Sequence, residues 1–160
     1  MIRLEPMTAE EFDESLRGGI ARRAEDQVRH GIWSPVEAAQ MSRAEFAQLL
    51  PQGRETAHFR FSKIIDAGSW QRVGEGWHSV EEKGGRVQFW LHWIWIEPHY
   101  RRRGYAKAVF STLEREAVTA GADRLGLYVA ADNKEALALY AELGFRTTNM
   151  RMAKTLPAPR

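Results

Sequence analysis

The sequence predicts an α/β fold of the α+β kind, in which one mixed, mostly antiparallel central sheet is flanked by helices. Amphipathic helix patterns occur in the first 50 residues and again after Gly104, and three runs rich in aromatic and β-branched residues lie between them. A chain of 160 residues is long enough to bury the core of one domain. We therefore expect a single domain over residues 1–156, followed by a polar tail at residues 157–160.

One strand and two helices are expected in the N-terminal part. Residues 2–7 read as a short strand that a proline ends. Thr8 and Glu11 have the spacing of a capping box, so a helix is expected to begin there and to run to about Arg29, with a Gly-Gly pair as its weak point. A second helix is predicted over residues 34–50, because a serine cap is followed by a proline at the first helical position.

Three successive strands are predicted over residues 58–66, 69–80 and 86–96. The turn sequences DAGS and EEKGGR separate them, so the simplest arrangement is an antiparallel meander. The third run, RVQFWLHWIWI, is apolar on both faces, which is typical of a central strand covered by helices on each side.

The C-terminal part is expected to add two helices and two strands. Apolar residues recur at helical spacing over residues 105–120, and a strand follows over residues 123–131. A short helix over residues 132–144 carries Asp132 in the position of a cap, and a weakly alternating strand over residues 145–156 closes the fold. The predicted order is β-α-α-β-β-β-α-β-α-β, without internal repeats or a linker between domains.

Composition excludes several classes of protein and site. The chain has no cysteine, which excludes disulfides, thiolate metal sites and a cysteine nucleophile. Its five histidines are scattered without ligand spacing, so no metal site is expected. A net charge of +2 gives no overall footprint for nucleic acid. No apolar run approaches the ~18 residues of a membrane helix, and the first residues lack a signal-peptide pattern, so we expect a cytoplasmic protein without a membrane partner.

The segment YRRRGYAKAVF, residues 100–110, places three arginines and Gly104 between a buried strand and a helix. The first N–H groups of a helix have no partner within the helix and carry partial positive charge, so they bind phosphate groups. Gly104 and Ala106 leave the backbone accessible, and arginine side chains add charge-assisted hydrogen bonds. This combination predicts a diphosphate site.

The same segment resembles a known family signature. Arg101-x-x-Gly104-x-Ala106 is similar to the Q/R-x-x-G-x-G/A motif of the GCN5-related N-acetyltransferases, the GNAT family. Further along, NKEALALYAELGF resembles the family's second signature, N-x-x-A-x-x-x-Y-x-x-x-G-F. The positions matched there are Asn133, Ala136, Tyr140, Gly144 and Phe145. The resemblance covers about residues 88–145 and implies one N-acetyltransferase domain whose fourth and fifth strands are splayed apart.

The resemblance also implies acetyl-coenzyme A (acetyl-CoA) as the acetyl donor, without a metal. In the family, the turn before the helix wraps the pyrophosphate, and the pantetheine arm pairs with the main chain of the preceding strand. The coenzyme-binding positions implied here are Ile94, Trp95, Ile96, Arg101, Arg102, Arg103, Gly104, Tyr105, Ala106, Lys107, Asn133 and Tyr140. Asn133 has an alternative role, which is to share in capping the helix that begins beside it.

Acyl transfer to an amine needs a group that protonates the leaving thiolate and a route for the proton of the amine. Tyr140 matches the tyrosine that is the general acid in the family; a tyrosine on the apolar face of a helix is otherwise part of the core. His92 occupies the strand position where many members have a glutamate base, and histidine titrates near neutrality. Glu75, His78 and a chain of waters are the alternatives for the base. Trp33, in the loop between the first two helices, is expected to contact the acceptor.

The predicted function is therefore transfer of an acetyl group from acetyl-CoA to a primary amine by direct attack in a ternary complex. The acceptor is expected to be a small-molecule or peptide amine, and a homodimer is compatible with such a fold. Two other classes are alternatives: a sensor that binds coenzyme A without turnover, and a nucleic-acid-binding protein that uses RRRG and Lys107 as a basic patch. The near-neutral net charge disfavours the second.

Overall fold

The computed structural model describes residues 1–159, and these form one five-stranded sheet and four α-helices. The elements are β1 (Ile2–Pro6), α1 (Ala9–Arg29), α2 (Ala38–Leu49), β2 (Phe59–Asp66), β3 (Arg72–Lys83), β4 (Arg86–Ile96), α3 (Tyr105–Thr119), β5 (Ala122–Leu127) and α4 (Lys134–Glu142). Single-turn 3₁₀ helices at Gly53–Glu55 and Pro98–Tyr100 precede β2 and α3. Within this part of the chain, no helix is both long and apolar enough to cross a membrane.

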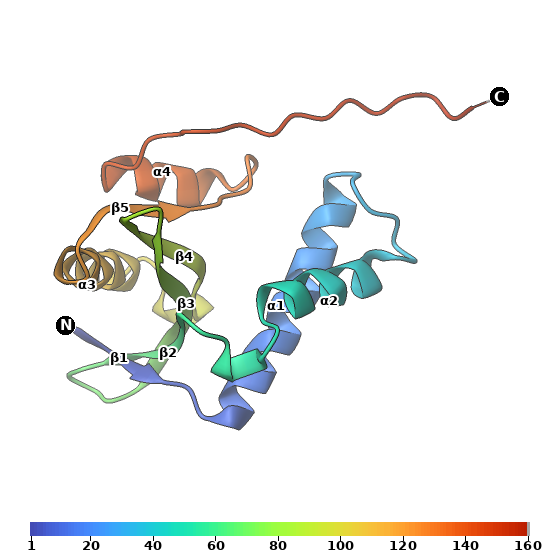
Figure 1. The fold of residues 1–160 in the computed structure, drawn as a ribbon. Coiled ribbons are helices and arrows are strands. Elements are labelled where there is room, and N and C mark those ends of the chain that lie inside the picture. Colours follow the sequence, from blue (N-terminus) through green and yellow to red (C-terminus); the bar gives the residue numbers. More distant parts are fainter. Residues whose placement is uncertain (160) are drawn as a thin grey trace.

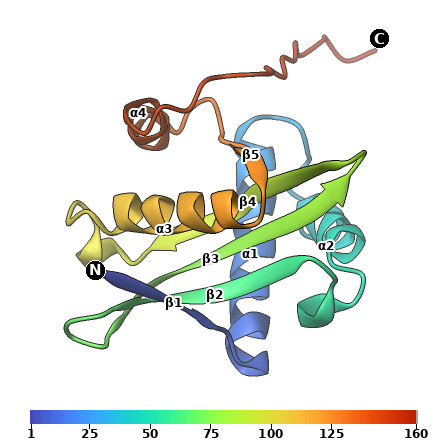
Figure 2. The same ribbon diagram turned by 60° about the vertical axis from the view of Figure 1, so that its left-hand side comes forward.

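The strands lie side by side in the order of the sequence, β1-β2-β3-β4-β5 (Figures 1 and 2). The first four pair antiparallel, and β5 pairs parallel to β4. A parallel pair needs a crossover connection, and α3 provides it. The mixed, mostly antiparallel sheet predicted from the sequence is confirmed.

Helices cover both faces of the sheet, and each face has its own core. Helix α3 lies on one face, and α1 and α2 lie on the other (Figure 2). The apolar side of α3 buries Phe110 and Leu113 almost completely in the first core. In the second core, the ring of Phe12 on α1 lies 4.6 Å from Phe61 and 6.0 Å from Trp77. Because β4 contributes side chains to both cores, its sequence is apolar on both faces.

The first helix begins as predicted. Thr8 Oγ1 accepts a hydrogen bond from the N–H of Glu11 (3.2 Å), and the Glu11 carboxylate accepts one from the N–H of Thr8 (2.8 Å), which completes the capping box. The helix continues through Gly18 and Gly19, so the weak point expected at this pair does not interrupt it. Gly19 allows close packing against α2, because a Cβ there would lie 3.4 Å from the ring of Phe46.

The second helix begins later than predicted, at Ala38 rather than directly after Ser34. Ser34 Oγ donates a hydrogen bond to the Glu37 carboxylate (2.7 Å), and Ser34 O accepts from the N–H groups of Glu37 and Ala38. The serine therefore closes a turn through Pro35 with its carbonyl. Its hydroxyl donates to the Glu37 carboxylate and does not cap the helix.

The predicted closing strand is wrong. Residues 146–159 form no strand, and the apolar side chains of Met150, Met152 and Leu156 are 73% to 86% exposed. Figure 1 shows this segment leading away from the body of the protein. Its weak alternation buries no side chain, so nothing offsets the entropy cost of ordering it in a sheet. Strand β5 is also shorter than predicted and ends at Leu127, and the last residue of the predicted tail lies outside the described part of the chain.

Candidate active site

Strand β4 has a free edge at its C-terminal end, where β5 leaves it. β4 pairs with β3 as far as Ile96, opposite Gly74, but its pairing with β5 ends at Leu91, opposite Leu127. The backbone from His92 to Ile96 therefore has a strand on one side only. Its outer N–H and C=O groups are available to a ligand, apart from Ile96 O, which accepts from Arg101. The splayed fourth and fifth strands that the resemblance implied are confirmed.

A β-bulge lies at the start of this free edge. Trp77 and His78 of β3 pair with Trp93 and Leu91 of β4, so His92 is an extra residue without a partner opposite it. A bulge bends a strand and increases its local twist. Because this bulge lies where the pairing with β5 ends, it accounts for the divergence of the two strands.

The chain leaves the free edge through the turn that carries the three arginines, and α3 begins directly after it. Gly104 is the N-cap of α3 with a φ of 85°, and Arg102 has a φ of 61°. Within residues 1–159, the N–H groups of residues 102–107 donate to no other group of the chain. A Cβ on Gly104 would meet nothing within 4 Å, so the space over the turn is open. This turn, residues 102–107, can therefore hold a diphosphate through free N–H groups and the partial charge of the helix; we call it the cradle.

The three arginine side chains differ in their contacts. Arg101 turns back to β4, where its Nε donates to Ile96 O (2.9 Å) and its guanidinium carbon lies 4.4 Å from the ring centre of Trp95. Arg102 and Arg103 are exposed beside the cradle. These two, rather than all three, are free to add charge-assisted bonds to a bound phosphate.

Tyr140 is half-buried on the side of α4 that faces α3. Its ring centre is 5.5 Å from that of Phe110 and 5.6 Å from that of Phe145. Its hydroxyl bonds to no other described residue, and burial raises the pKa of the phenol, so the group stays protonated at neutral pH. An ion pair between Lys107 and Glu142 ties α3 to α4, which leaves Lys107 to serve the cradle through its backbone N–H. A protonated hydroxyl without a partner fits the role of a general acid.

Asn133, rather than Asp132, caps α4. The Oδ1 atom of Asn133 accepts a hydrogen bond from the N–H of Ala136 (3.2 Å), which confirms the capping alternative; its amide nitrogen remains free to donate to a ligand. The predicted cap at Asp132 is wrong, because its carboxylate faces another helix. Oδ2 of Asp132 accepts from Arg29 Nε (3.1 Å) and lies 3.0 Å from Nε2 of His30.

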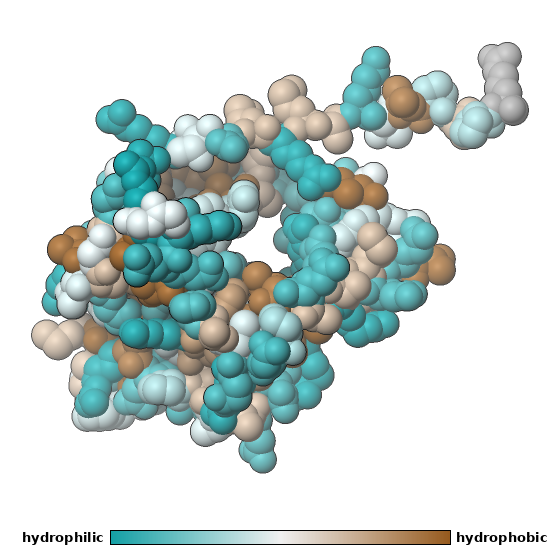
Figure 3. All heavy atoms as spheres, viewed as in Figure 1, coloured by the Kyte–Doolittle hydropathy of each residue, from teal (hydrophilic) through white to brown (hydrophobic). Residues whose placement is uncertain are grey.

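The Asp132 contacts join two parts of the molecule that are otherwise apart. Arg29 and His30 stand at the C-terminal end of α1, whereas Asp132 precedes α4. Figure 3 shows an opening through the molecule between α1 and the sheet, and Figure 1 shows the end of α1 and the loop before α4 on the same side of it. These ion pairs therefore close one side of the opening, between the end of α1 and the loop before α4.

His92 lies at the bulge, with its ring turned toward β2 and β3. Its Nε2 lies 2.8 Å from Ser79 Oγ, and its ring centre is 4.7 Å from that of Phe59. Burial lowers the pKa of His92 to about 4, so the imidazole is neutral at pH 7. Its place beside the free edge fits the predicted base, but its low pKa makes it a weak proton acceptor.

The two other candidates for the base are less available. His78 lies on the α3 face, 4.9 Å from the ring of Phe89 and with Nε2 3.5 Å from Glu116 of α3, and burial lowers its pKa to about 4. Glu75 lies on the face toward α1, but both of its carboxylate oxygens already accept hydrogen bonds. The structure thus places His92 and Glu75 on the α1 side of the sheet and His78 on the other side. Over residues 1–159, no group of three or more acidic or histidine side chains is arranged to hold a metal.

Sequence reasoning missed a cluster of side chains around Glu75. The guanidinium of Arg22 on α1 lies over the indole rings of Trp93 and Trp95 at the free edge. Arg72 Nη2 donates to the Glu75 carboxylate at 2.8 Å. These residues come from α1, β3 and β4, so no local motif marks them. One local signal pointed to this cluster: Trp93 and Trp95 are two residues apart in the sequence, so they lie on the same face of a strand.

Trp33, which was expected to contact the acceptor, lies in the loop between α1 and α2. It is half-buried, and the guanidinium carbon of Arg23 is 5.5 Å from its ring centre. The contact with an acceptor stays a prediction.

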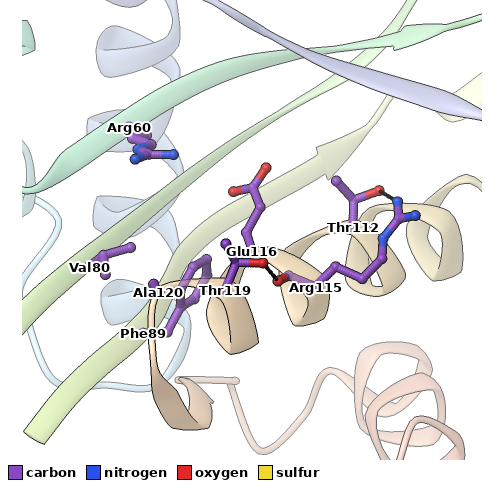
Figure 4. A pocket seen from close by; sticks show the side chains of 8 residues that line it. All are labelled: Arg60, Val80, Phe89, Thr112, Arg115, Glu116, Thr119 and Ala120. Carbon is purple, nitrogen blue, oxygen red and sulfur yellow. Dashed lines mark hydrogen bonds between the residues drawn. The ribbon is translucent and has the colours of Figure 1, made fainter.

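A hollow of about 480 Å³ lies away from these residues, over the C-terminal half of α3 (Figure 4). Its lining consists of Arg60, Val80, Phe89, Thr112, Arg115, Glu116, Thr119 and Ala120. Helix α3 has 15 residues, so its two ends are about 22 Å apart. The hollow is therefore separate from the cradle, and none of the predicted site residues lines it.

The sheet, its free edge and the cradle define an acetyltransferase fold, and comparisons with known proteins agree. The model of the acetyltransferase (GNAT) family matches residues 71–145, which include both signatures. A crystal structure of YycN from Bacillus subtilis has a TM-score of 0.90 with 32% sequence identity and covers 99% of this chain and 100% of that chain. An acetyltransferase structure from Pyrococcus furiosus, with 19% identity and a TM-score of 0.64, supports the fold alone.

Sequence relatives extend the match over nearly the whole chain. The chain is 33% identical to the uncharacterized N-acetyltransferase YycN of Bacillus subtilis (strain 168) over 155 residues, which are 97% of this chain and 99% of the relative. It is 32% identical to the uncharacterized N-acetyltransferase YdgE of the same strain, over 96% of this chain and 97% of the relative. This protein therefore belongs to the acetyltransferase (GNAT) family.

Proposed function

We propose that this protein transfers an acetyl group from acetyl-CoA to a primary amine by direct attack in a ternary complex. One observation carries the proposal: the free N–H groups of the cradle stand directly after the free edge of β4. An anion-binding turn and an unpaired strand edge in this order match the two parts of a coenzyme, its diphosphate and its pantetheine amides.

The donor would bind along these two features. The N–H groups of the cradle and the exposed side chains of Arg102 and Arg103 would hold the diphosphate, while the backbone from Ile94 to Ile96 would pair with the pantetheine arm. The free amide nitrogen of Asn133 offers one more donor beside this path. The thioester would then lie near the bulge, between the free edge of β4 and α4.

The transfer step forms one bond and breaks another. The neutral amine attacks the thioester carbon, a C–N bond forms, and the C–S bond breaks to release a thiolate. Tyr140 supplies a proton to that thiolate, because its hydroxyl is protonated and has no partner among the described residues. The proton of the amine leaves to water, with His92 as a weaker alternative because of its low pKa.

Release of free thiol tests the proposal. Acetyl-CoA is incubated with the protein and a panel of primary amines, and thiol is followed by a colorimetric reagent. Amine-dependent release is the expected result. Saturable binding of coenzyme A without release with any amine would identify a sensor instead, and salt-sensitive retention of an oligonucleotide would identify a nucleic-acid-binding protein. Arg101 uses its Nε to bond Ile96 O, which leaves fewer free donors in the basic segment than the sequence implied and disfavours the last outcome.

A further inference from the structure

Arg22 of α1 stands at the free edge of β4 and is fixed there by two indole rings. Its guanidinium carbon lies 4.2 Å from the ring centre of Trp93 and 5.0 Å from that of Trp95. The two rings are parallel, with an interplanar angle of 6° and centres 6.1 Å apart. Guanidinium groups stack on aromatic faces in this way, and the stack restricts their motion. Arg22 is thus a positioned cation on the α1 side of the edge where the thioester would lie.

The sequence of α1 makes room for this position. Gly18 lies one helical turn before Arg22, and a Cβ on Gly18 would lie 3.1 Å from Nη2 and 3.2 Å from Nη1 of that guanidinium. A glycine inside a helix costs stability relative to alanine. Gly18 therefore leaves the space that the guanidinium of Arg22 needs, which explains a glycine at this helical position.

The buried carboxylate beneath Arg22 is already satisfied by other donors. Glu75 is 7% exposed; its Oε1 accepts from Ser15 Oγ (2.8 Å) and from Trp93 Nε1 (3.0 Å), and its Oε2 accepts from Arg72 Nη2 (2.8 Å). Nη2 of Arg22 lies 3.8 Å from Oε1, which is close enough for attraction but too far for a hydrogen bond. The negative charge of Glu75 therefore attracts Arg22, but the N–H groups of Arg22 do not bond to it.

The donors of Arg22 are accordingly unused. Within residues 1–159 its guanidinium donates no hydrogen bond, and its Nε is buried without a partner. The side chain is nevertheless 32% exposed, so a ligand can reach it. A fixed guanidinium with free donors matches a carboxylate, which accepts two parallel hydrogen bonds from it.

We propose that Arg22 binds a carboxylate of the acceptor, and that the acceptor is therefore an amino acid or a short peptide with a free amine and a free carboxylate. This inference rests on the acetyltransferase function proposed above. Stacked on Trp93 and Trp95, Arg22 would hold the carboxylate on the α1 side and direct the amine toward the free edge of β4.

Other charged groups near Arg22 fit an acceptor that carries both charges. Burial lowers the pKa of Arg22, while Glu75, Glu25, Glu97 and Asp26 raise it, so the guanidinium remains charged. Asp26 is paired with Arg29 of the same helix (2.7 Å). Since Glu75 is also satisfied, the carboxylates of Glu25 and Glu97 remain to favour an ammonium group close by, which a purely anionic acceptor lacks.

Matched pairs of acceptors test the inference. The twenty L-amino acids and a set of dipeptides are compared with their C-terminal amides, with acetyl-CoA as donor and thiol release as the signal. We expect kcat/KM to be about 10- to 100-fold higher for the free carboxylates, as one lost charge-assisted bidentate contact implies.

Variants locate the effect at Arg22. Arg22→Gln should raise KM for the free carboxylates about 10- to 100-fold and leave the amides unchanged, and Arg22→Lys should restore part of the loss. Arg17→Gln removes the same charge from an exposed position of α1 and should change neither class. Calorimetric titration of N-acetylated products into the coenzyme A complex gives a second readout, in which Arg22→Gln should lose affinity for the carboxylate product alone. Thermal unfolding checks that the variant folds.

The outcomes separate the two proposals. Equal kcat/KM for carboxylates and amides, or an equal loss with both in Arg22→Gln, would overturn the acceptor class while the acetyltransferase function stands. No thiol release with any acceptor, although coenzyme A binds, would overturn the proposed function and this inference with it.

Discussion

Oδ2 of Asp132 lies 3.1 Å from Nε of Arg29, and this contact joins the loop before α4 to the C-terminal end of α1. The same oxygen lies 3.0 Å from Nε2 of His30. Both partners are about half exposed, so the contact adds little to stability. Because it lies at the opening beside β4, we expect it to affect how fast ligands enter and leave.

Asp132→Asn removes the negative charge from this connection and weakens it. We expect the melting temperature to change little, whereas coenzyme A should dissociate several times faster, because the opening is no longer held on that side. Stopped-flow displacement of a fluorescent coenzyme A analogue measures the rate. Glu45→Gln is the control, since it removes the charge from a similarly exposed pair, Arg23 with Glu45 at 2.8 Å, that joins α1 to α2. An unchanged dissociation rate in Asp132→Asn would contradict this view of the opening.

Tyr140→Phe removes the proposed general acid and keeps the ring. Turnover should fall about 100-fold or more, while affinity for coenzyme A and the melting temperature stay close to those of the unchanged protein, because the hydroxyl has no partner among the described residues. Steady-state kinetics and calorimetry measure the two quantities. Tyr128→Phe, at an 87% exposed tyrosine, is the matched control. Full activity of Tyr140→Phe would remove this residue from the acid role.

Gly74 allows β3 and β4 to approach each other at the free edge. A Cβ there would collide with the carbonyl oxygen of Trp95, a backbone atom that cannot move aside without disturbing the sheet. Gly74→Ala should therefore lower the free energy of unfolding by about 1–3 kcal/mol. Gly76→Ala places its Cβ 3.4 Å from Trp93 O and should cost much less. Urea unfolding measures both, and similar losses in the two variants would mean that the strands adapt.

One buried and one half-buried histidine make the folded protein less stable in acid. Burial lowers the pKa of His92 and of His78 to about 4, below the value near 6.5 in an unfolded chain. Between these values the unfolded chain takes up protons that the folded protein does not, so the free energy of unfolding should fall as pH falls from about 6.5 to about 4. His92 is the clearer case, since burial alone lowers its pKa, whereas the charges of Arg60 and His92 add to the effect of burial at His78.

Urea titrations across this pH range measure the effect. His92→Gln should reduce the slope of the unfolding free energy against pH by an amount that corresponds to at most one proton. His99→Gln, at an exposed position, should leave this slope unchanged. The same slope in His92→Gln would show that this imidazole titrates normally.

Local sequence signals predicted most of the elements and the turn that forms the cradle. The capping box of Thr8 and Glu11 needs only residues three apart, and Gly104 before a helical pattern needs only its neighbours. Both features form as expected because neither depends on the rest of the fold. Weaker local signals failed. The Ser34 hydroxyl donates to the Glu37 carboxylate instead of capping α2, and Asp132 pairs with Arg29 of α1 instead of capping α4.

Contacts between distant parts of the chain were beyond sequence reasoning. The stack of Arg22 on Trp93 depends on where α1 crosses the sheet, and the bulge at His92 depends on the register between β3 and β4. The pairing of β5 ends at Leu127 because β4 bends away, which no pattern in β5 itself indicates. Such features require the three-dimensional arrangement.

Calorimetric titration of coenzyme A into two glycine variants tests the central claim most directly. Gly104 and Gly121 stand at opposite ends of α3 with φ of 85° and 81°, and a Cβ at either meets nothing closer than 4.0 Å. Valine at either position therefore brings a similar backbone strain. If the cradle holds the diphosphate, Gly104→Val will abolish measurable binding and Gly121→Val will bind coenzyme A like the unchanged protein. Equal affinity in both variants and the unchanged protein would contradict the assignment of this turn as the coenzyme site.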